Sequence, residues 1–280
     1  EDARVTYVRP SEYLTVTEHW NFAFSHATGD WQGLLCDDHA YIPSMLRIIK
    51  DEIDQCPTAA SINFSFANFS GEFPISGQRP NRFWIPEYSN KRTLYDTQDL
   101  VAEMFDKIPN RGETKKKIPQ ITNSFYSRKC IERVREINNG NLFSPLDPLA
   151  SSSMLILALS EKTLRLFFPL VVFGNPVESA GNHKLAKKVF QKMNQGSEFR
   201  FSPIPSLHVF PSALAETMLR VRNRHPELFD SYQLNTINLF RACRDSILEL
   251  ADQFGESRDE QALYDSAYSR LSESEQLEIE

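Results

Sequence analysis

Two short segments of the chain carry side chains whose types and spacing could do chemistry. Cys36-Asp37-Asp38-His39 gathers four residues that can each bind zinc or another divalent metal ion. Ser206-Leu207-His208 places a hydroxyl close in sequence to an imidazole, as a nucleophile and its general base would require. Sequence neighbours rarely converge on one ion or face each other, so an ordinary polar loop remains the alternative interpretation of both segments.

Signatures of other catalytic sites are missing from the sequence. The segments around Gly174 and Gly196 contain too few glycines for a phosphate-binding loop, and they lack its lysine. Neither a Gly-x-Ser-x-Gly nor a His-Glu-x-x-His pattern occurs. We therefore expect a protein that is not an enzyme and needs no cofactor. An enzyme of unknown class, with a metal-dependent or histidine-dependent site around Cys36–His39 or His208, is the alternative.

The cysteines are interpreted as reduced thiols. They are widely spaced and form no Cys-x-x-Cys pair, which favours mostly buried thiols in a reducing compartment. The four positions are Cys36, Cys56, Cys130 and Cys243.

The charge of the chain is concentrated near its end. Residues 256–280 hold eight acids and two arginines, which accounts for the whole formal net charge of −6. The rest of the chain is balanced, so it lacks the basic field of a dedicated nucleic-acid binder. The lysines at 115–117 are interpreted as a solvated loop, with an import signal or an RNA contact as the alternatives. We predict that the acidic, serine-rich segment 256–280 is disordered.

Aromatic side chains supply the strongest remaining signal, in the segment from Ser61 to Trp84. Ile62, Phe64 and Phe66 alternate with smaller residues, which predicts a strand with one apolar face in the core. Glycines and prolines from 71 to 80 then predict an irregular turn. Phe83 and Trp84 follow this turn, where they either fill the core or contact a partner.

The elements that position these residues divide into two kinds. Alternating β-branched and aromatic residues predict strands at Val5–Val8, Tyr13–Thr17 and Trp20–Phe24. From residue 92 onward the apolar residues recur at helical spacing, as in the segments beginning at Asp96 and after Asp230.

The fold class that follows is α+β, with a β-rich N-terminal half on a mostly helical C-terminal domain. We expect three regions: a strand-rich partner-binding domain over 1–91, a helical domain over 92–255, and the acidic tail over 256–280. The most apolar run, Met154 to Phe173, contains three charged residues and Pro169, so it is not a membrane span. Its first part, Met154–Phe168, is predicted to be a buried helix that ends at Pro169.

Two groups of residues resemble a known viral family. Ile62-Asn-Phe-Ser-Phe-Ala-Asn-Phe-Ser-Gly-Glu-Phe-Pro74 resembles the segment of phlebovirus non-structural NSs proteins in which an aromatic strand leads into Gly-Glu-(Phe/Leu)-Pro. The second group, Glu216–Arg220, Pro226–Asp230 and Leu239–Asp245, is similar to the family's helical core. About a quarter of the chain takes part in the close matches, and the region from Lys107 to Phe210 does not align.

The resemblance implies a virulence factor without catalysis. Members of the family antagonise interferon and innate immunity by binding host proteins, and the sandfly-fever-like type binds the exchange factor of translation initiation factor two. A component of the PKR or RIG-I pathway is the other host partner that the resemblance implies. It also implies action in the host cytoplasm, with the nucleus as a second compartment, and neither a specific nucleic acid nor a membrane as partner. The positions that match the partner-binding residues are Phe83, Trp84, Phe24, His26 and Tyr7.

Overall fold

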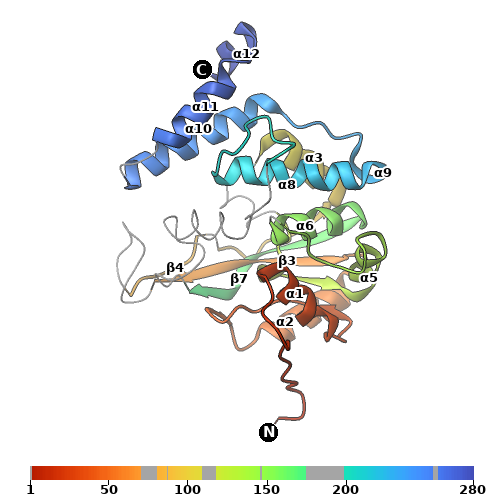
Figure 1. Cartoon of the computed structure of the whole chain (residues 1–280). Helices are drawn as coiled ribbons and strands as arrows, with labels where there is room; N and C mark the ends of the chain where they lie inside the picture. The colour runs from red at the N-terminus through yellow and green to blue at the C-terminus, as the bar shows by residue number, and fades with distance from the viewer. Residues whose placement is uncertain are drawn as a thin grey trace.

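The computed structural model describes residues 2–70, 81–86, 88–108, 118–145, 147–174, 199–254 and 258–280 (Figure 1). A curled mixed sheet and the helices packed around it make the fold α+β, as the sequence predicts. The helices and the single 3-10 turn in these ranges are α1 (Val16–Ser25), α2 (Met45–Gln55), α3 (Thr97–Lys107), η1 (Ile121–Asn123), α5 (Arg128–Ile137), α6 (Pro148–Ala158), α8 (Phe210–Arg224), α9 (Pro226–Phe229), α10 (Thr236–Phe254), α11 (Arg258–Tyr268) and α12 (Glu273–Ile279).

Two long parallel strands, β3 (Ser61–Phe69) and β7 (Lys162–Gly174), form the centre of the sheet. The outer edge of β3 pairs first with β6 and then with β4, and the outer edge of β7 pairs first with β5 and then with β2. The two-residue strand β1 extends the sheet beyond β6. The strands are β1 (Trp31–Gln32), β2 (His39–Tyr41), β3 (Ser61–Phe69), β4 (Phe83–Trp84), β5 (Arg92–Asp96), β6 (Ser124–Ser127) and β7 (Lys162–Gly174).

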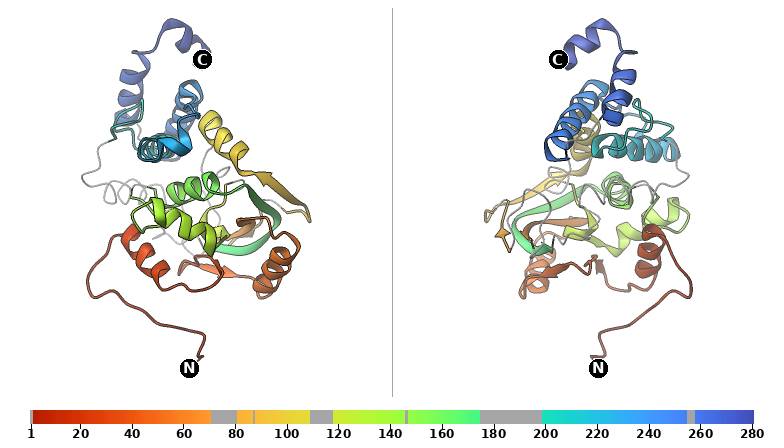
Figure 2. Two further views of the ribbon diagram at one scale, coloured as in Figure 1. Left: turned by 90° about the vertical axis from the view of Figure 1, so that its right-hand side faces the viewer. Right: turned by 60° about the vertical axis from the view of Figure 1, so that its left-hand side comes forward.

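The sheet separates two apolar clusters. One cluster joins Met45 and Ile49 of α2 to the strand residues Ile62, Phe64 and Leu166. The larger cluster holds the apolar residues of the other helices, from Phe24 in α1 to Ile279 in α12. Both views in Figure 2 place α6 between the sheet and the helices α8 and α10. The helices α8 and α10, which lie on the side of α6 away from the sheet, therefore share one continuous core with α6.

Several sequence predictions are confirmed. Ile62, Phe64 and Phe66 are buried in β3, as their alternation predicts. The helix predicted after Asp96 is α3, whose apolar residues Leu100 and Met104 face the core. The long helix predicted after Asp230 is α10.

The N-terminal strands were predicted wrongly. Residues 2–15 contain no helix or strand, and the segment predicted as the strand Trp20–Phe24 lies within α1. The backbone N–H of Glu18 donates to the Thr15 hydroxyl and the Glu18 carboxylate accepts from the Thr15 N–H, which forms a capping box. The capping box favours the start of a helix at this point. The helix also buries Phe24, and together these two effects outweigh the β propensity of the residues.

The apolar run after residue 148 is also different from its prediction. It holds a helix and a strand, α6 and β7, rather than one helix over Met154–Phe168. Asp147 caps α6 by accepting from two backbone N–H groups, and the helix ends at Ala158. A continuously apolar run has no periodicity that distinguishes a buried helix from a buried strand. Pro169 lies inside β7, where the pairing register with Ser65 shifts and no regular ladder bond is needed.

The predicted regions also need correction. The segment 92–255 supplies β5, β6 and β7, so the sheet draws on both sides of the predicted boundary at residue 91. The predicted disordered tail instead forms α11 and α12 over most of its length. These helices pack Tyr264 and Ile279 into the core. The acidic overall composition of the segment does not indicate that it contains such buried apolar residues.

Two predicted features lie outside the described residues, namely the turn over 71–80 and the lysine loop over 115–117. Among the helices that the structure does describe, none combines the length and hydropathy needed to cross a membrane.

Candidate functional site

The short strand β4 lies at the edge of the sheet and carries two of the predicted contact residues. Its Phe83 is paired with Phe69 of β3, and its Trp84 is paired with Asn68. In the part of the chain that the structure describes, no strand pairs with the other side of β4. An unpaired strand edge offers backbone N–H and C=O groups to another chain.

Local contacts hold β4 in place. The backbone N–H of Ser70 donates to the Arg82 carbonyl oxygen over 2.9 Å, and the Arg82 N–H donates to the Ser70 hydroxyl over 3.0 Å. Asn81 has a φ of 51°, in the left-handed region that asparagine tolerates better than most residues. The Arg82 guanidinium lies 5.7 Å from the centre of the Trp84 ring, within the range of a cation–π contact. The segment therefore enters β4 with a defined geometry.

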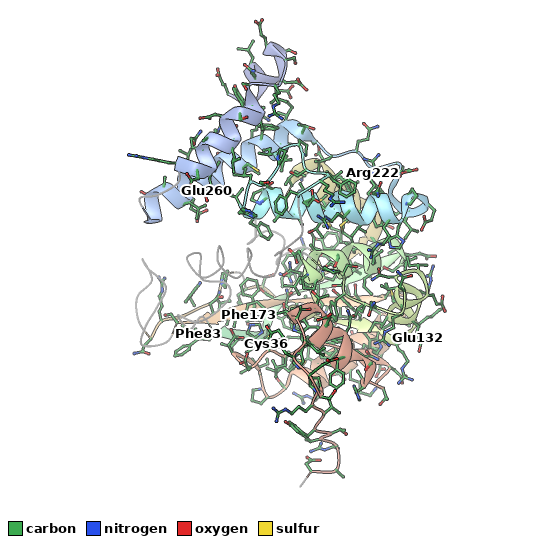
Figure 3. All side chains as sticks on the ribbon, viewed as in Figure 1. Cys36, Phe83, Glu132, Phe173, Arg222 and Glu260 are labelled. Carbon is green, nitrogen blue, oxygen red and sulfur yellow. The ribbon has the colours of Figure 1, made fainter. Side chains whose placement is uncertain are left out.

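Large apolar side chains are exposed along this edge. Phe83 is 56% exposed and Phe69 is 42% exposed, and as directly opposed residues they lie on the same face of the sheet. Trp84 is half-buried, and Ile85, the residue that follows β4, is exposed. Figure 3 labels Phe83 on this strand. We call this surface the aromatic edge; it consists of Phe69 and Phe83, with Trp84 and Ile85 next to Phe83 in sequence.

Sequence reasoning found part of this surface and missed the rest. Phe83 and Trp84 were singled out because they follow the glycine- and proline-rich segment. Phe69 was not, although it stands at the end of the alternating run, where the core pattern stops. The pairing of Phe69 with Phe83, which joins the two halves of the surface, is visible only once the strands are paired.

The other predicted contact residues lie elsewhere. Phe24 is only 3% exposed and meets the ring of Phe143 edge-on at 5.2 Å, so its prediction as a contact in the free protein is wrong. Phe24 lies in α1, a helix where a strand was predicted, and α1 packs this side chain into the larger apolar cluster. His26 is exposed and packs against Phe22, with 4.7 Å between the ring centres. Tyr7 is exposed in the N-terminal segment before α1. The structure does not join these residues to the aromatic edge.

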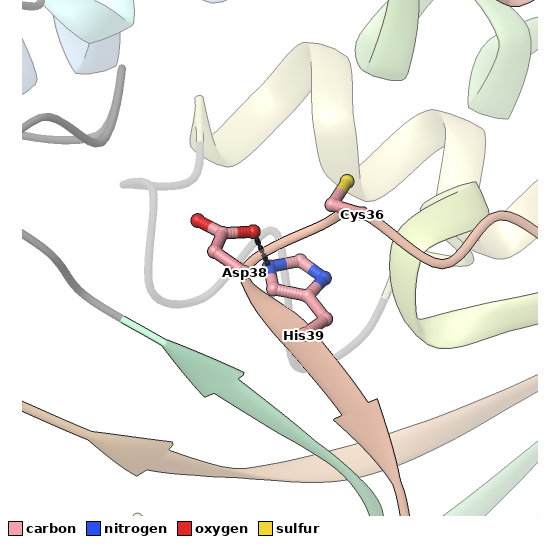
Figure 4. A group of neighbouring side chains, drawn as sticks. All are labelled: Cys36, Asp38 and His39. Carbon is pink, nitrogen blue, oxygen red and sulfur yellow. Dashed lines mark ion pairs between the residues drawn. The ribbon is translucent and has the colours of Figure 1, made fainter.

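The alternative site around Cys36 has a geometry that its sequence did not indicate. One ligand atom each from Cys36, Asp38 and His39 lies within 4.8 Å of the others (Figure 4). The Nε2 atom of His39 is 3.3 Å from a carboxylate oxygen of Asp38. Asp37 is exposed and does not belong to this cluster. Three of the four residues in the segment therefore converge.

The remaining candidates for chemistry have packing roles. His208 is half-buried and meets the Phe199 ring edge-on at 5.3 Å, while Ser206 is exposed with a φ of 59°. Burial raises the pKa of the Cys130 thiol to about 11 and raises that of Cys243 further, so both stay protonated at neutral pH. Cys36 and Cys56 are both half-buried, and of the two it is Cys36 that lies in the cluster of ligand-type side chains found among the described residues.

No protein-family model matches the chain, and no curated protein sequence matches it significantly.

Proposed function

We propose that this protein is a non-catalytic binding protein that presents the aromatic edge to a host protein. By the resemblance described above, it is a viral virulence factor that antagonises interferon defence and the shutdown of translation under stress. Its partner is then the exchange factor of translation initiation factor two, or a component of the PKR or RIG-I pathway. Its place of action is the host cytoplasm, with the nucleus as a second compartment.

The observation that supports this proposal most is the exposed pair of Phe69 and Phe83 on an open strand edge. A phenylalanine ring left in water forgoes about 1.5–3 kcal/mol of burial free energy. Two such rings on one face of the sheet are typical of a binding surface rather than of a core.

The composition of the aromatic edge also suits tight binding. Aromatic residues and arginine supply most of the residues that dominate interface energies, and Arg82 lies against Trp84 here. Pairing with β3 holds the backbone of Phe83 and Trp84, so little backbone conformational entropy is lost when a partner covers their rings. A partner could also extend the sheet by pairing with β4, which would add backbone hydrogen bonds to the apolar contacts.

The test is co-purification from stressed human cells with the double variant Phe83→Ala/Trp84→Ala. We expect the double variant to lose its host partner, because truncating one hot-spot residue costs about 2 kcal/mol or more, or about 30-fold in affinity. Tyr13→Ala is the matched control, since Tyr13 is 89% exposed but lies in the N-terminal segment.

Two results separate the parts of this proposal. If the double variant retains every partner of the wild type, the aromatic edge is not the binding surface. If the wild type captures no component of the translation-initiation or innate-immune machinery, the family-level function is wrong.

The convergence of Cys36, Asp38 and His39 favours a second candidate, a metal-dependent enzyme of unknown class. A purified wild-type protein without bound zinc or iron would count against this candidate.

A further inference from the structure

We propose that Cys36, Asp38 and His39 form a binding site for Zn²⁺, with a fourth coordination position open to water. The site is built from residues outside the aromatic edge and does not depend on the proposed host partner. It is argued from the turn that carries the ligands, their separations, their support and their chemistry.

A β-turn brings the ligands together. The backbone N–H of His39 donates to the Cys36 carbonyl oxygen over 3.1 Å, which closes a four-residue turn with Asp37 and Asp38 at its centre. In an extended strand, Cys36 and His39 would point to opposite faces. The turn reverses the chain between them and brings their ligand atoms within 4.8 Å of one another, with Asp38 and His39 the pair in direct contact (Figure 4).

The separations suit a small metal ion. Zinc bonds of about 2.0–2.3 Å in a tetrahedral site place neighbouring ligand atoms roughly 3.5 Å apart. The 3.3 Å between Asp38 and His39 is already close to this spacing, and no pair in the cluster exceeds 4.8 Å. The ligand atoms that lie farthest apart would have to approach each other by roughly 1 Å to reach this spacing.

The sheet holds the turn firmly. The N–H of Gly174 in β7 donates to the Asp38 carbonyl oxygen over 2.8 Å, and a Cβ atom at Gly174 would lie only 2.3 Å from that oxygen. Glycine is therefore needed for this close approach. The His39 ring stacks on Phe173 of β7, with 4.2 Å between the ring centres. Support of this kind fixes ligands before the metal arrives and lowers the entropic cost of binding.

The ligand types select the metal. A thiolate, an imidazole and a carboxylate are all ligands of zinc, and three protein ligands plus water is the arrangement of an open zinc site. Calcium and magnesium instead prefer oxygen ligands alone, which the thiol and the imidazole do not provide. The Asp38 and His39 side chains are 25% and 12% exposed, so the ion has access from solvent.

The experiment titrates the metal-stripped full chain with Co²⁺ and then displaces it with Zn²⁺. We expect one Co²⁺ per chain, with the charge-transfer absorption of a cobalt–thiolate bond, and loss of that absorption when Zn²⁺ is added. Cys36→Ser should abolish the absorption. Asp38→Asn should weaken Zn²⁺ binding at least about 10-fold, since even residues that only support a ligand contribute about 10–100-fold.

Matched controls distinguish the site from adventitious thiol binding. Cys56→Ser removes another half-buried cysteine, and Asp37→Asn removes the exposed acid of the same turn; neither should change the affinity. Circular dichroism checks that each variant is folded. If Cys36→Ser does not fold, the Zn²⁺ affinity of Asp38→Asn tests the proposal instead. Absence of uptake at one ion per chain by the wild type overturns the proposal, as does equal binding by Asp38→Asn or loss of binding in Cys56→Ser.

Discussion

The two ends of the central strand pair β3–β7 differ in what covers them. At the end where both strands begin, polar side chains are buried and bonded to one another, for example Ser61 to Thr163 at 2.7 Å and Arg165 to Asn63 at 2.5 Å. At the other end, Phe69 and its partner Phe83 are exposed. We call these the closed end and the open end.

The difference indicates that the two ends of the strand pair have separate roles, one in stability and the other in binding. Buried polar groups cost free energy unless their hydrogen bonds are made, so the closed end fixes the register of the strands. The register shift beside Pro169 separates the two ends. The open end carries both proposed binding features in one row of paired residues, which runs from Trp84 through Asn68 and Phe173 to His39. Stability should therefore depend on the closed end and binding on the open end.

The largest expected contrast is between two phenylalanines. Phe64 is fully buried in β3, and Phe64→Ala should lower the free energy of unfolding by about 3–5 kcal/mol through lost burial and the cavity left behind. Phe83→Ala, at the exposed edge, should change it by no more than about 0.5 kcal/mol. Chemical denaturation of both variants measures this. Equal losses would show that the edge belongs to the stabilising core.

A smaller effect is expected from the polar network of the closed end. Asn63→Ala removes the side-chain oxygen that accepts from the Arg165 guanidinium, and the amide that donates to the Ser124 hydroxyl. Because all three groups are buried, the loss should cost about 1–3 kcal/mol. Asn90, which is exposed, provides the control Asn90→Ala. A neutral Asn63→Ala in the same denaturation assay would mean that the network does not fix the sheet.

The smallest effect concerns alkaline pH. Burial raises the pKa of Tyr126 at the closed end, and burial, with a lesser effect of Cys36, raises the pKa of Tyr41 to about 12. In the unfolded chain a tyrosine releases its proton near pH 10, so stability is retained below pH 10 and falls as the pH rises above it. Each raised pKa contributes a slope of at most about 1.4 kcal/mol per pH unit.

Phe replacement of either tyrosine should remove its share of this slope in unfolding experiments between pH 9 and 11. Tyr13→Phe, in the exposed N-terminal segment, is the control. An unchanged slope in Tyr41→Phe alone would show that burial does not raise the pKa of Tyr41 and that its ring in β2 is open to solvent.

The elements that the sequence predicts well are those with a local signal. The alternation in β3 and the helical spacing in α3 are visible without any knowledge of the fold. α1 was predicted wrongly because its residues have high β propensity, and only the Thr15–Glu18 capping box indicates a helix. β7 was missed because Leu164 and Leu166 belong to an apolar run without periodicity. Pairing with β3 decides its structure, and pairing is not a local property.

The sites follow the same rule. Phe83 and Trp84 are predicted as contact residues from their residue types and their place after the glycine- and proline-rich segment 71–80. The exposure of Phe69 depends on where β4 pairs with β3, and the convergence of Cys36 with His39 depends on a turn that leaves no strong sequence signal. Burial of Phe24 likewise follows from α1 and not from the sequence around it.

The parallel pairing of β3 with β7 has a consequence for synthesis of the protein. β3 ends at Phe69 and β7 begins at Lys162, so roughly 90 residues must be made between them. At about 5–20 residues per second, the phenylalanine-rich β3 leaves the ribosome roughly 5–20 s before its central partner exists. During that interval its apolar side chains have no completed sheet to join. Chaperones that bind exposed hydrophobic segments should therefore associate with nascent chains that end between β3 and β7, and release those that extend past Gly174.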